Sequence, residues 1–207
     1  MPLSLLLSMS KIKHTKNELK AQRDALRRFK RYLPTLLLKK QQLQMEMRQL
    51  EQRMEEVRGE EAMLVAGLGA WVRLFAEPVD VAAAVKLVSV KTGTGNIAGV
   101  NIPTLQEIEF APVEVDLHQT PSWLDEGAQT VEQMVRLRIE VEILAEQHRL
   151  LAEELRTTSQ RVNLFEKVKI PECEENIRII RIFLGDAQTA DVARSKLAKS
   201  KAPEVAA

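Results

Sequence analysis

The sequence predicts a mainly α fold: a long antiparallel coiled coil of two helices, with a small middle region that contains a β-hairpin. Three observations lead to this prediction. Residues 15–76 and 128–185 repeat apolar residues every three or four positions, and residues 77–127 between them lose the repeat. Only 4% of the 207 residues are aromatic, whereas 29% are charged. Such a composition is typical of long helices rather than of a strand-rich sandwich.

The first helix is predicted over residues 15–76. Thr15 and Glu18 fit a capping box, in which both side chains satisfy free backbone amides at the helix start. The repeat keeps its register through Pro34, so we expect a bend there rather than a break. A helix of this length would span about 90 Å, too long for a compact globule. Its predicted seam residues are Leu19, Leu26, Phe29, Leu33, Leu36, Leu43, Met47, Leu50, Met54 and Val57.

The second helix is predicted over residues 128–185, where Gly185 is the expected stop. Its apolar register slips between Phe165 and Ile170, next to Pro171. Residues 186–207 are expected to form a flexible basic tail, and residues 1–14 an N-terminal extension. The predicted seam residues of the second helix are Leu137, Val141, Leu144, Leu151, Leu155, Val162 and Phe165.

Each seam is narrow, and neither helix can bury its own seam. We therefore expect the two helices to pack against each other in one chain. The alternative is that each helix pairs with another chain, as in a dimeric coiled coil.

The middle region, residues 77–127, is acidic and carries the signals of extended structure. Residues 85–90 are rich in β-branched side chains, and the Gly-rich residues 91–96 connect them to residues 97–103. This order predicts two short strands joined by a Gly-rich turn. A third extended piece is expected within residues 108–117, and the whole region is expected to form a knob at the far end of the helical hairpin.

Composition and motifs argue against an active site in this chain. One cysteine and three histidines offer little material for a disulfide or a metal centre. Residues 93–99 are spaced GxGxxxG, one residue too long for a dinucleotide fingerprint, and no helix-forming stretch follows them. No window approaches the roughly 20 apolar residues of a membrane span. We expect no catalytic residue, bound cofactor, metal site or direct membrane span.

The most informative charge pattern is a basic run between residues 11 and 40, with 11 Lys and Arg against two acidic residues. It can be a solvated helix face, a nucleic-acid surface, or a basic end that sits in an acidic protein socket. The net charge of +1 and the scarcity of nearby aromatics argue against nucleic acid. Candidate contacts with a protein partner are Lys16, Lys20, Arg23, Arg27 and Arg28.

Five tracts in order, residues 12–17, 36–40, 96–103, 120–123 and 161–172, together resemble the D subunit of V-type and A-type ATP synthases, the central rotor stalk. The resemblance covers most of the chain. Where the family continues its Leu-Leu-Lys tract with Lys-Arg-Asp, this chain has Lys40, Gln41 and Gln42, which weakens any transfer of a contact role to them. The residues that carry the family motifs are Asn96, Gly99, Arg161, Asn163, Glu166 and Pro171.

The resemblance implies a non-catalytic rotor shaft that couples ATP synthesis or hydrolysis to H⁺ or Na⁺ translocation by rotation. It implies as partners the A and B subunits of a catalytic hexamer, the F subunit of the stalk, and the C subunit that links to the membrane rotor ring. ATP, ADP and Mg²⁺ would be bound by the A and B subunits, and the complex would lie on the cytoplasmic side of the plasma membrane. The competing hypothesis is a self-associating coiled-coil scaffold or tether.

Overall fold

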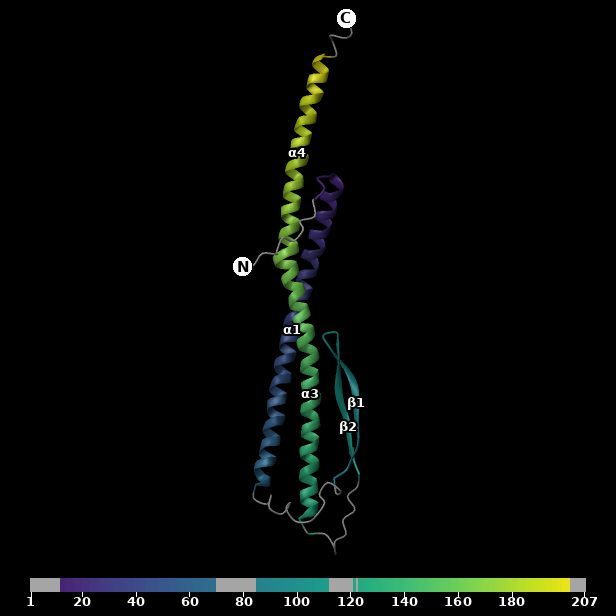
Figure 1. Ribbon diagram of the computed structural model, residues 1–207, viewed down its shortest axis with the longest axis vertical. Coiled ribbons are helices and arrows are strands. Elements are labelled where there is room, and N and C mark those ends of the chain that lie inside the picture. The colour runs from purple at the N-terminus through teal and green to yellow at the C-terminus, as the bar shows by residue number, and fades with distance from the viewer. Residues whose placement is uncertain (1–11, 70–84, 112–120, 122, 202–207) are drawn as a thin grey trace, which may run out of the picture. The chain divides into compact units, whose positions relative to one another are not determined.

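The computed structural model describes residues 12–69, 85–111, 121 and 123–201. Along the chain it forms α1 (Lys16–Leu68), β1 (Leu87–Ile97), β2 (Val100–Phe110), α3 (Leu124–Leu164), the π-helical turn η2 (Phe165–Lys169) and α4 (Ile170–Lys201) (Figure 1). The predicted fold class, mainly α with a hairpin in the middle, is confirmed. The chain divides into unit 1, residues 1–38 and 159–207, and unit 2, residues 39–158.

In unit 2, α1 and α3 lie side by side and run in opposite directions (Figure 1). Two ion pairs give the direction: Lys39 Nζ lies 2.6 Å from Glu154 Oε1, and Arg53 Nη2 lies 2.8 Å from Glu140 Oε1. Residue numbers rise along α1 as they fall along α3. The antiparallel pairing within one chain is therefore confirmed for this unit.

The core of unit 2 consists of two clusters between the helices and the hairpin. Both helices contribute to each cluster, and β2 contributes to the first. Because the seam of each helix alone is too narrow to be buried, these shared clusters are what keep the helices together. The first contains Leu43, Ile102 and Leu151, and the second contains Val57, Val141 and Leu144.

The hairpin is longer than predicted and turns at a different place. β1 and β2 each contain 11 residues, and they pair antiparallel from Ile97 and Val100 to Leu87 and Phe110. The Gly-rich residues 91–96, which were predicted to connect the strands, lie inside β1. Residues 108–110 of the predicted third piece belong to β2, and residues 112–117 lie outside the described residues.

The hairpin part of the predicted knob packs against the helices rather than lying beyond their end, whereas residues 77–84, 112–120 and 122 of the knob lie outside the described residues. The turn end of the hairpin packs alongside the helix pair, because Ile97, Ala98 and Val100 contact the cluster of Leu43 and Leu151. Figure 1 shows the hairpin beside α3. The apolar residues around the turn explain this position, since they need cover that a two-stranded hairpin cannot supply by itself.

In unit 1, the N-terminal part of α1 packs against the segment that follows Ser159. The rings of Phe29 and Phe165 lie 4.9 Å apart between centroids and are tilted by 55°, a favourable aromatic contact. Asn176 is buried and its Nδ2 donates to Gln22 Oε1 at 3.4 Å. The buried apolar residues on this side of the unit are Val162, Cys173, Ile177 and Ile180.

Two prolines lie in helical structure with different consequences. α1 is continuous through Pro34, so the expected absence of a break is confirmed, while the bend stays a prediction. Near Pro171, the residues Phe165–Lys169 form a π-helical turn. A π-turn inserts one extra residue, which accounts for the predicted slip of the apolar register. It also widens the helix just before Pro171, which has no amide hydrogen to donate and whose ring crowds the preceding turn.

The predicted ends of the second helix need correction. It begins at Leu124 rather than residue 128, and α4 continues past Gly185 to Lys201, where a flexible tail was predicted. Gly185 costs about 1 kcal/mol relative to Ala, but the alanine-rich sequence after it has high helix propensity. An ion pair of 2.6 Å between Asp191 and Arg194 adds support three residues apart. At the other helix, α1 ends at Leu68, and residues 70–76 lie outside the described residues.

Leu151→Ala should destabilise the chain by about 2–5 kcal/mol, because Leu151 is fully buried in the first cluster of unit 2 and truncation leaves a cavity. The free energy of unfolding in urea, followed by far-UV circular dichroism, measures this loss. Met63→Ala is the matched control, since Met63 is 76% exposed and should change stability by less than about 0.5 kcal/mol. Equal effects of the two substitutions would contradict the assigned core.

Cys173 should react slowly with a thiol reagent in the native protein. Its side chain is buried, and burial raises the pKa of its thiol, so less of the reactive thiolate is present at neutral pH. We expect the native rate with Ellman's reagent to be about tenfold or more below the rate in denaturant. The control is Cys173→Ala combined with Lys196→Cys, which places the thiol on an exposed position. Equal rates for native Cys173 and the control thiol would contradict the packing of unit 1.

Candidate functional site

The two units carry opposite net charge. Unit 1 contains 18 Lys and Arg against 9 Asp and Glu, a net charge of +9, whereas unit 2 contains 12 against 20, a net charge of −8. The near-neutral total of the chain therefore conceals a strong segregation. Long-range attraction favours acidic partners for unit 1 and basic partners for unit 2.

The predicted partner contacts form an exposed basic face on α1. Lys16, Lys20, Arg23 and Arg27 are spaced four, three and four residues apart, which places them on one side of the helix. These four residues and Arg28 are all exposed. In the described part of the chain, none of the five is in an ion pair. Their charge is therefore available to a partner, in contrast to charges already held by a carboxylate.

The predicted seam residues all lie at least partly inside. Leu43, Val57, Val141, Leu144, Leu151 and Val162 are buried, and the other predicted seam residues are half-buried. Within each unit, the seam residues of the two helices therefore bury one another. A chain whose seams are covered in this way does not need a second copy to bury them.

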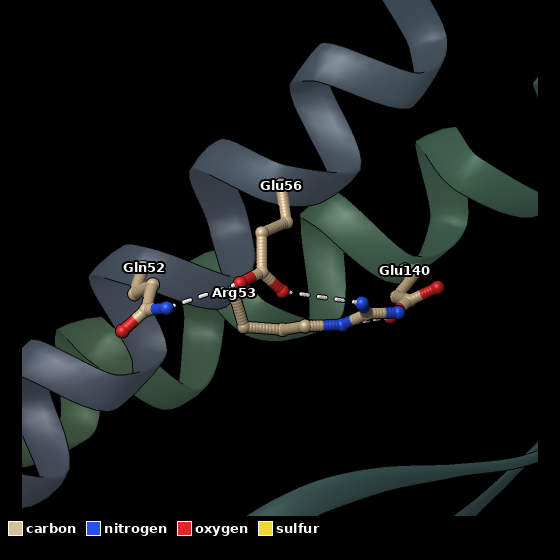
Figure 2. A network of polar contacts seen from close by, with 4 residues as sticks. All are labelled: Gln52, Arg53, Glu56 and Glu140. Atoms are coloured by element: carbon tan, nitrogen blue, oxygen red, sulfur yellow. Dashed lines mark hydrogen bonds and ion pairs between the residues drawn. The ribbon is translucent and has the colours of Figure 1, made fainter.

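The best-formed polar link between the helices of unit 2 joins Arg53 to Glu140. Figure 2 shows the Arg53 guanidinium reaching from α1 to the Glu140 carboxylate on α3, with Gln52 and Glu56 beside it. Arg53 Nε and Nη2 both donate to Glu140 Oε1, at 3.1 and 2.8 Å. The hydrogen bond to Glu140 is the main reason that the pKa of Arg53 is raised. Because the pair is partly exposed, it contributes little to the free energy of unfolding, and its main effect is to orient α1 relative to α3.

His148 is also part of a link between helices. Its Nε2 lies 3.1 Å from Glu51 Oε1 on α1. Its position beside the seam allows the imidazole to reach across to the opposite helix. The sequence offered one signal for such links, because charged residues that flank seam positions, such as Arg53 and Glu140, commonly pair across a coiled coil.

Two of the motif residues, Asn96 and Gly99, build the hairpin turn. Asn96 Nδ2 donates to Asn101 Oδ1 at 2.8 Å, and Asn96 Oδ1 accepts from the Gly99 amide at 3.1 Å. Ala98 and Gly99 have φ of 50° and 81°. Positive φ at both central residues defines a type I′ turn, for which glycine is favoured at the second position. These two motif residues therefore determine where the hairpin reverses.

The other four motif residues surround the π-turn of unit 1. Arg161 and Asn163 precede it, Glu166 lies within it, and Pro171 follows it. All four side chains are exposed, and in the described residues neither Arg161 nor Glu166 is in an ion pair. Pro171 accounts for local helix geometry, whereas the three polar side chains face outward, where a partner can reach them.

Two kinds of functional element are absent from the described residues. Among them, no group of three or more His, Cys, Asp or Glu is arranged to hold a metal ion. Within the described ranges, no helix is both long and apolar enough to cross a membrane. The features that the structure does supply are covered seams, a basic helix face and an ordered hairpin, all of which are suited to protein contacts.

Comparisons with known proteins agree with this picture. The family model of the ATP synthase D subunit matches residues 18–200. The D subunit of a V-type ATP synthase from Borreliella burgdorferi is 47% identical over 93% of this chain and 95% of its own length. Those from Chlamydia muridarum and Chlamydia pneumoniae are 37% and 35% identical, over 93% and 92% of this chain and 96% and 92% of their own lengths. The chain belongs to the D-subunit family of V-type ATP synthases.

Proposed function

We propose that this chain is the non-catalytic rotor shaft of a V-type ATP synthase and couples ATP synthesis or hydrolysis to translocation of H⁺ or Na⁺ by rotation. Membership in the D-subunit family is the observation that carries this proposal. The paired helices support it, because two helices that share a core and cross-helix ion pairs resist twisting better than one helix. A shaft that transmits torque needs this stiffness.

The proposed partners follow from membership in the D-subunit family, and the distribution of charge suggests where one of them binds. The basic face of Lys16, Lys20, Arg23 and Arg27 contacts the lining of a hexamer of A and B subunits, which bind ATP, ADP and Mg²⁺ at their interfaces. The F subunit binds the stalk, and the C subunit connects it to the membrane rotor ring. The complex lies on the cytoplasmic side of the plasma membrane, with this chain peripheral to it.

Coupling by such a shaft requires that it contact the surrounding subunits differently at each angle. A conformational equilibrium shifts only when a ligand binds the alternative states with different free energy. The π-turn of the second helix in unit 1 and the hairpin beside α3 in unit 2 make the two sides of the helix pair unequal within each unit. Unequal sides supply the differential contacts.

The alternative of a self-associating scaffold is less well supported. A scaffold of this kind would bury its seams in a homodimer, and its helix content would depend on concentration. The predicted seam residues are instead buried or half-buried within one chain.

Co-expression with the A, B and F subunits should give a complex that contains this chain and whose ATPase activity differs from that of the A and B subunits alone. Size-exclusion chromatography with light scattering and a steady-state ATPase assay measure both properties. A stable homodimer that does not associate with the A and B subunits would contradict the proposal and favour the scaffold.

Combined Lys16→Glu, Lys20→Glu, Arg23→Glu and Arg27→Glu should lower ATP-driven ion pumping per ATP hydrolysed by about tenfold, because like charges then meet across the proposed contact. The isolated variant should unfold within about 0.5 kcal/mol of the native chain, since these side chains are exposed. The matched control exchanges Lys and Arg at the same four positions and keeps the charge. Normal pumping by the reversed variant would rule out this contact.

A further inference from the structure

The two edges of the hairpin in unit 2 differ in whether their outward backbone amides and carbonyls have hydrogen-bond partners. On β2, the Pro103 carbonyl accepts a hydrogen bond from the buried Gln147 side chain of α3. The Ile108 carbonyl accepts another from Arg136 Nη1 at 3.4 Å, and the Arg136 guanidinium stacks over the Phe110 ring. The outer edge of β2 is therefore covered by α3.

The strand register shows which groups of β1 point to the opposite side. Ile97 and Val100 close the two-residue turn, so they form a hydrogen-bonded pair. Pairs alternate along an antiparallel ladder, and Thr94 and Pro103 form one of the pairs that do not exchange hydrogen bonds. Pro103 agrees with this assignment, because it has no amide hydrogen and its carbonyl is taken by α3. The amide and carbonyl of Thr94 consequently point away from β2.

The same alternation turns the backbone groups of Thr92 and Asn96 to the outer edge of β1. In the described part of the chain, no hydrogen bond is made to the outward amide or carbonyl of Thr92, Thr94 or Asn96. The side chains of all three are exposed. Register irregularities occur between Leu87 and Ser89 and between Lys91 and Thr92, so residues 92–97 are the longest regular part of the strand.

The usual protection of an exposed strand edge is weak over residues 92–97 of β1, which lie beyond both register irregularities. Proteins guard such edges with lysines, prolines or bulges. Lys91 is the lysine of this strand, but its ammonium group is held by Glu107 at 2.9 Å and Glu109 at 2.6 Å, both on β2. Its charge is therefore directed toward β2 rather than toward the outer edge.

We propose that the outer edge of β1 at residues 92–96 adds an extended strand from another subunit of the rotary complex. Backbone hydrogen bonds to Thr92, Thr94 and Asn96 would supply the affinity, as in other cases of strand addition. The partner strand would carry apolar side chains where it meets the exposed Val88 and Val90. This inference rests on the proposed function, which supplies the other subunits.

Charge favours a different subunit over a second copy of this chain. Unit 2 has a net charge of −8, so pairing of β1 with β1 of another copy would bring two strongly acidic units together. A neutral or basic strand meets no such repulsion. Since Lys91 already has two carboxylate partners, an acidic residue beside it would gain little.

Hydrogen–deuterium exchange resolved to single residues tests the proposal on the full chain, alone and in the complex with the A, B, F and C subunits. In the free chain, the amides of Thr92 and Thr94 should exchange at least about tenfold faster than those of Gly93 and Gly95, which face β2. In the complex, the Thr92 and Thr94 amides should slow by about tenfold or more.

The outcomes separate this inference from the proposed function. Fast exchange at Thr92 and Thr94 in a correctly assembled complex would overturn the strand addition and leave the shaft intact. Failure of the chain to assemble would overturn both. Protection of the same amides in a dimer of the isolated chain would show that a second copy occupies the edge, which also overturns the proposal.

Thr94→Pro provides a second test, because it removes the outward amide and places a ring on the edge. Thr94 pairs with Pro103 without exchanging hydrogen bonds, so proline at position 94 removes no hydrogen bond between the two strands. We expect the affinity for the subunit that supplies the strand to fall roughly tenfold. Thr94→Val keeps the amide and should bind within about twofold of the native chain. Assembly of the proline variant with native affinity, while the Gly93 and Gly95 amides remain protected, would overturn the proposal.

Discussion

The narrow apolar seam on each long helix is the constraint on which the rest of the structure depends. A helix with such a seam gains little from intrinsic propensity and must cover its apolar residues with another element. In unit 2 this cover comes from the antiparallel packing of α1 and α3, centred on Leu43 with Leu151 and on Val57 with Val141. In unit 1, Phe29 and Phe165 make the corresponding contact. Each unit therefore closes its seam without a second chain.

Because the seam residues are covered within each unit, the other residues of the helices lie at the surface and determine its charge. The outward side of α1 in unit 1 carries cations that no carboxylate of the described chain holds, while unit 2 is acidic overall. The hairpin adds an ordered strand pair beside α3, held by Gln147 and Arg136. The exposed cations and the ordered hairpin are therefore surface features that suit contacts with other proteins.

Much of this arrangement could be predicted from the sequence, because helical periodicity is a local and repeated signal. The seam positions and the slip before Pro171 appear in the spacing of apolar residues, and the slip corresponds to a π-turn. The helix start appears in the Thr15 and Glu18 pattern, and the Thr15 hydroxyl accepts a hydrogen bond from the Glu18 amide at 3.2 Å. The position of the hairpin could not be predicted, since it depends on contacts of Ile102 with Leu43 and Leu151, far apart in sequence.

The incorrect predictions of the hairpin turn and of the helix stop also have local causes. Glycines at 93 and 95 suggested a turn, but they lie inside β1. There the side chains of Gln106 and Thr104 on β2 occupy the space that a Cβ would need at Gly93 and at Gly95, respectively. The turn itself falls at Ala98 and Gly99, where φ is positive. Gly185 suggested a helix stop, yet one glycine is outweighed by the alanine-rich sequence that follows it.

Direct observation of rotation tests the central claim, that this chain turns inside the hexamer as its shaft. A probe attached to an introduced cysteine at Glu126→Cys, an exposed position at the start of α3, reports the motion in a complex immobilised through its A subunits. The account predicts stepwise rotation in one direction that requires ATP and stops when ATP is removed. A complex that hydrolyses ATP while the probe stays fixed relative to the A subunits would contradict it.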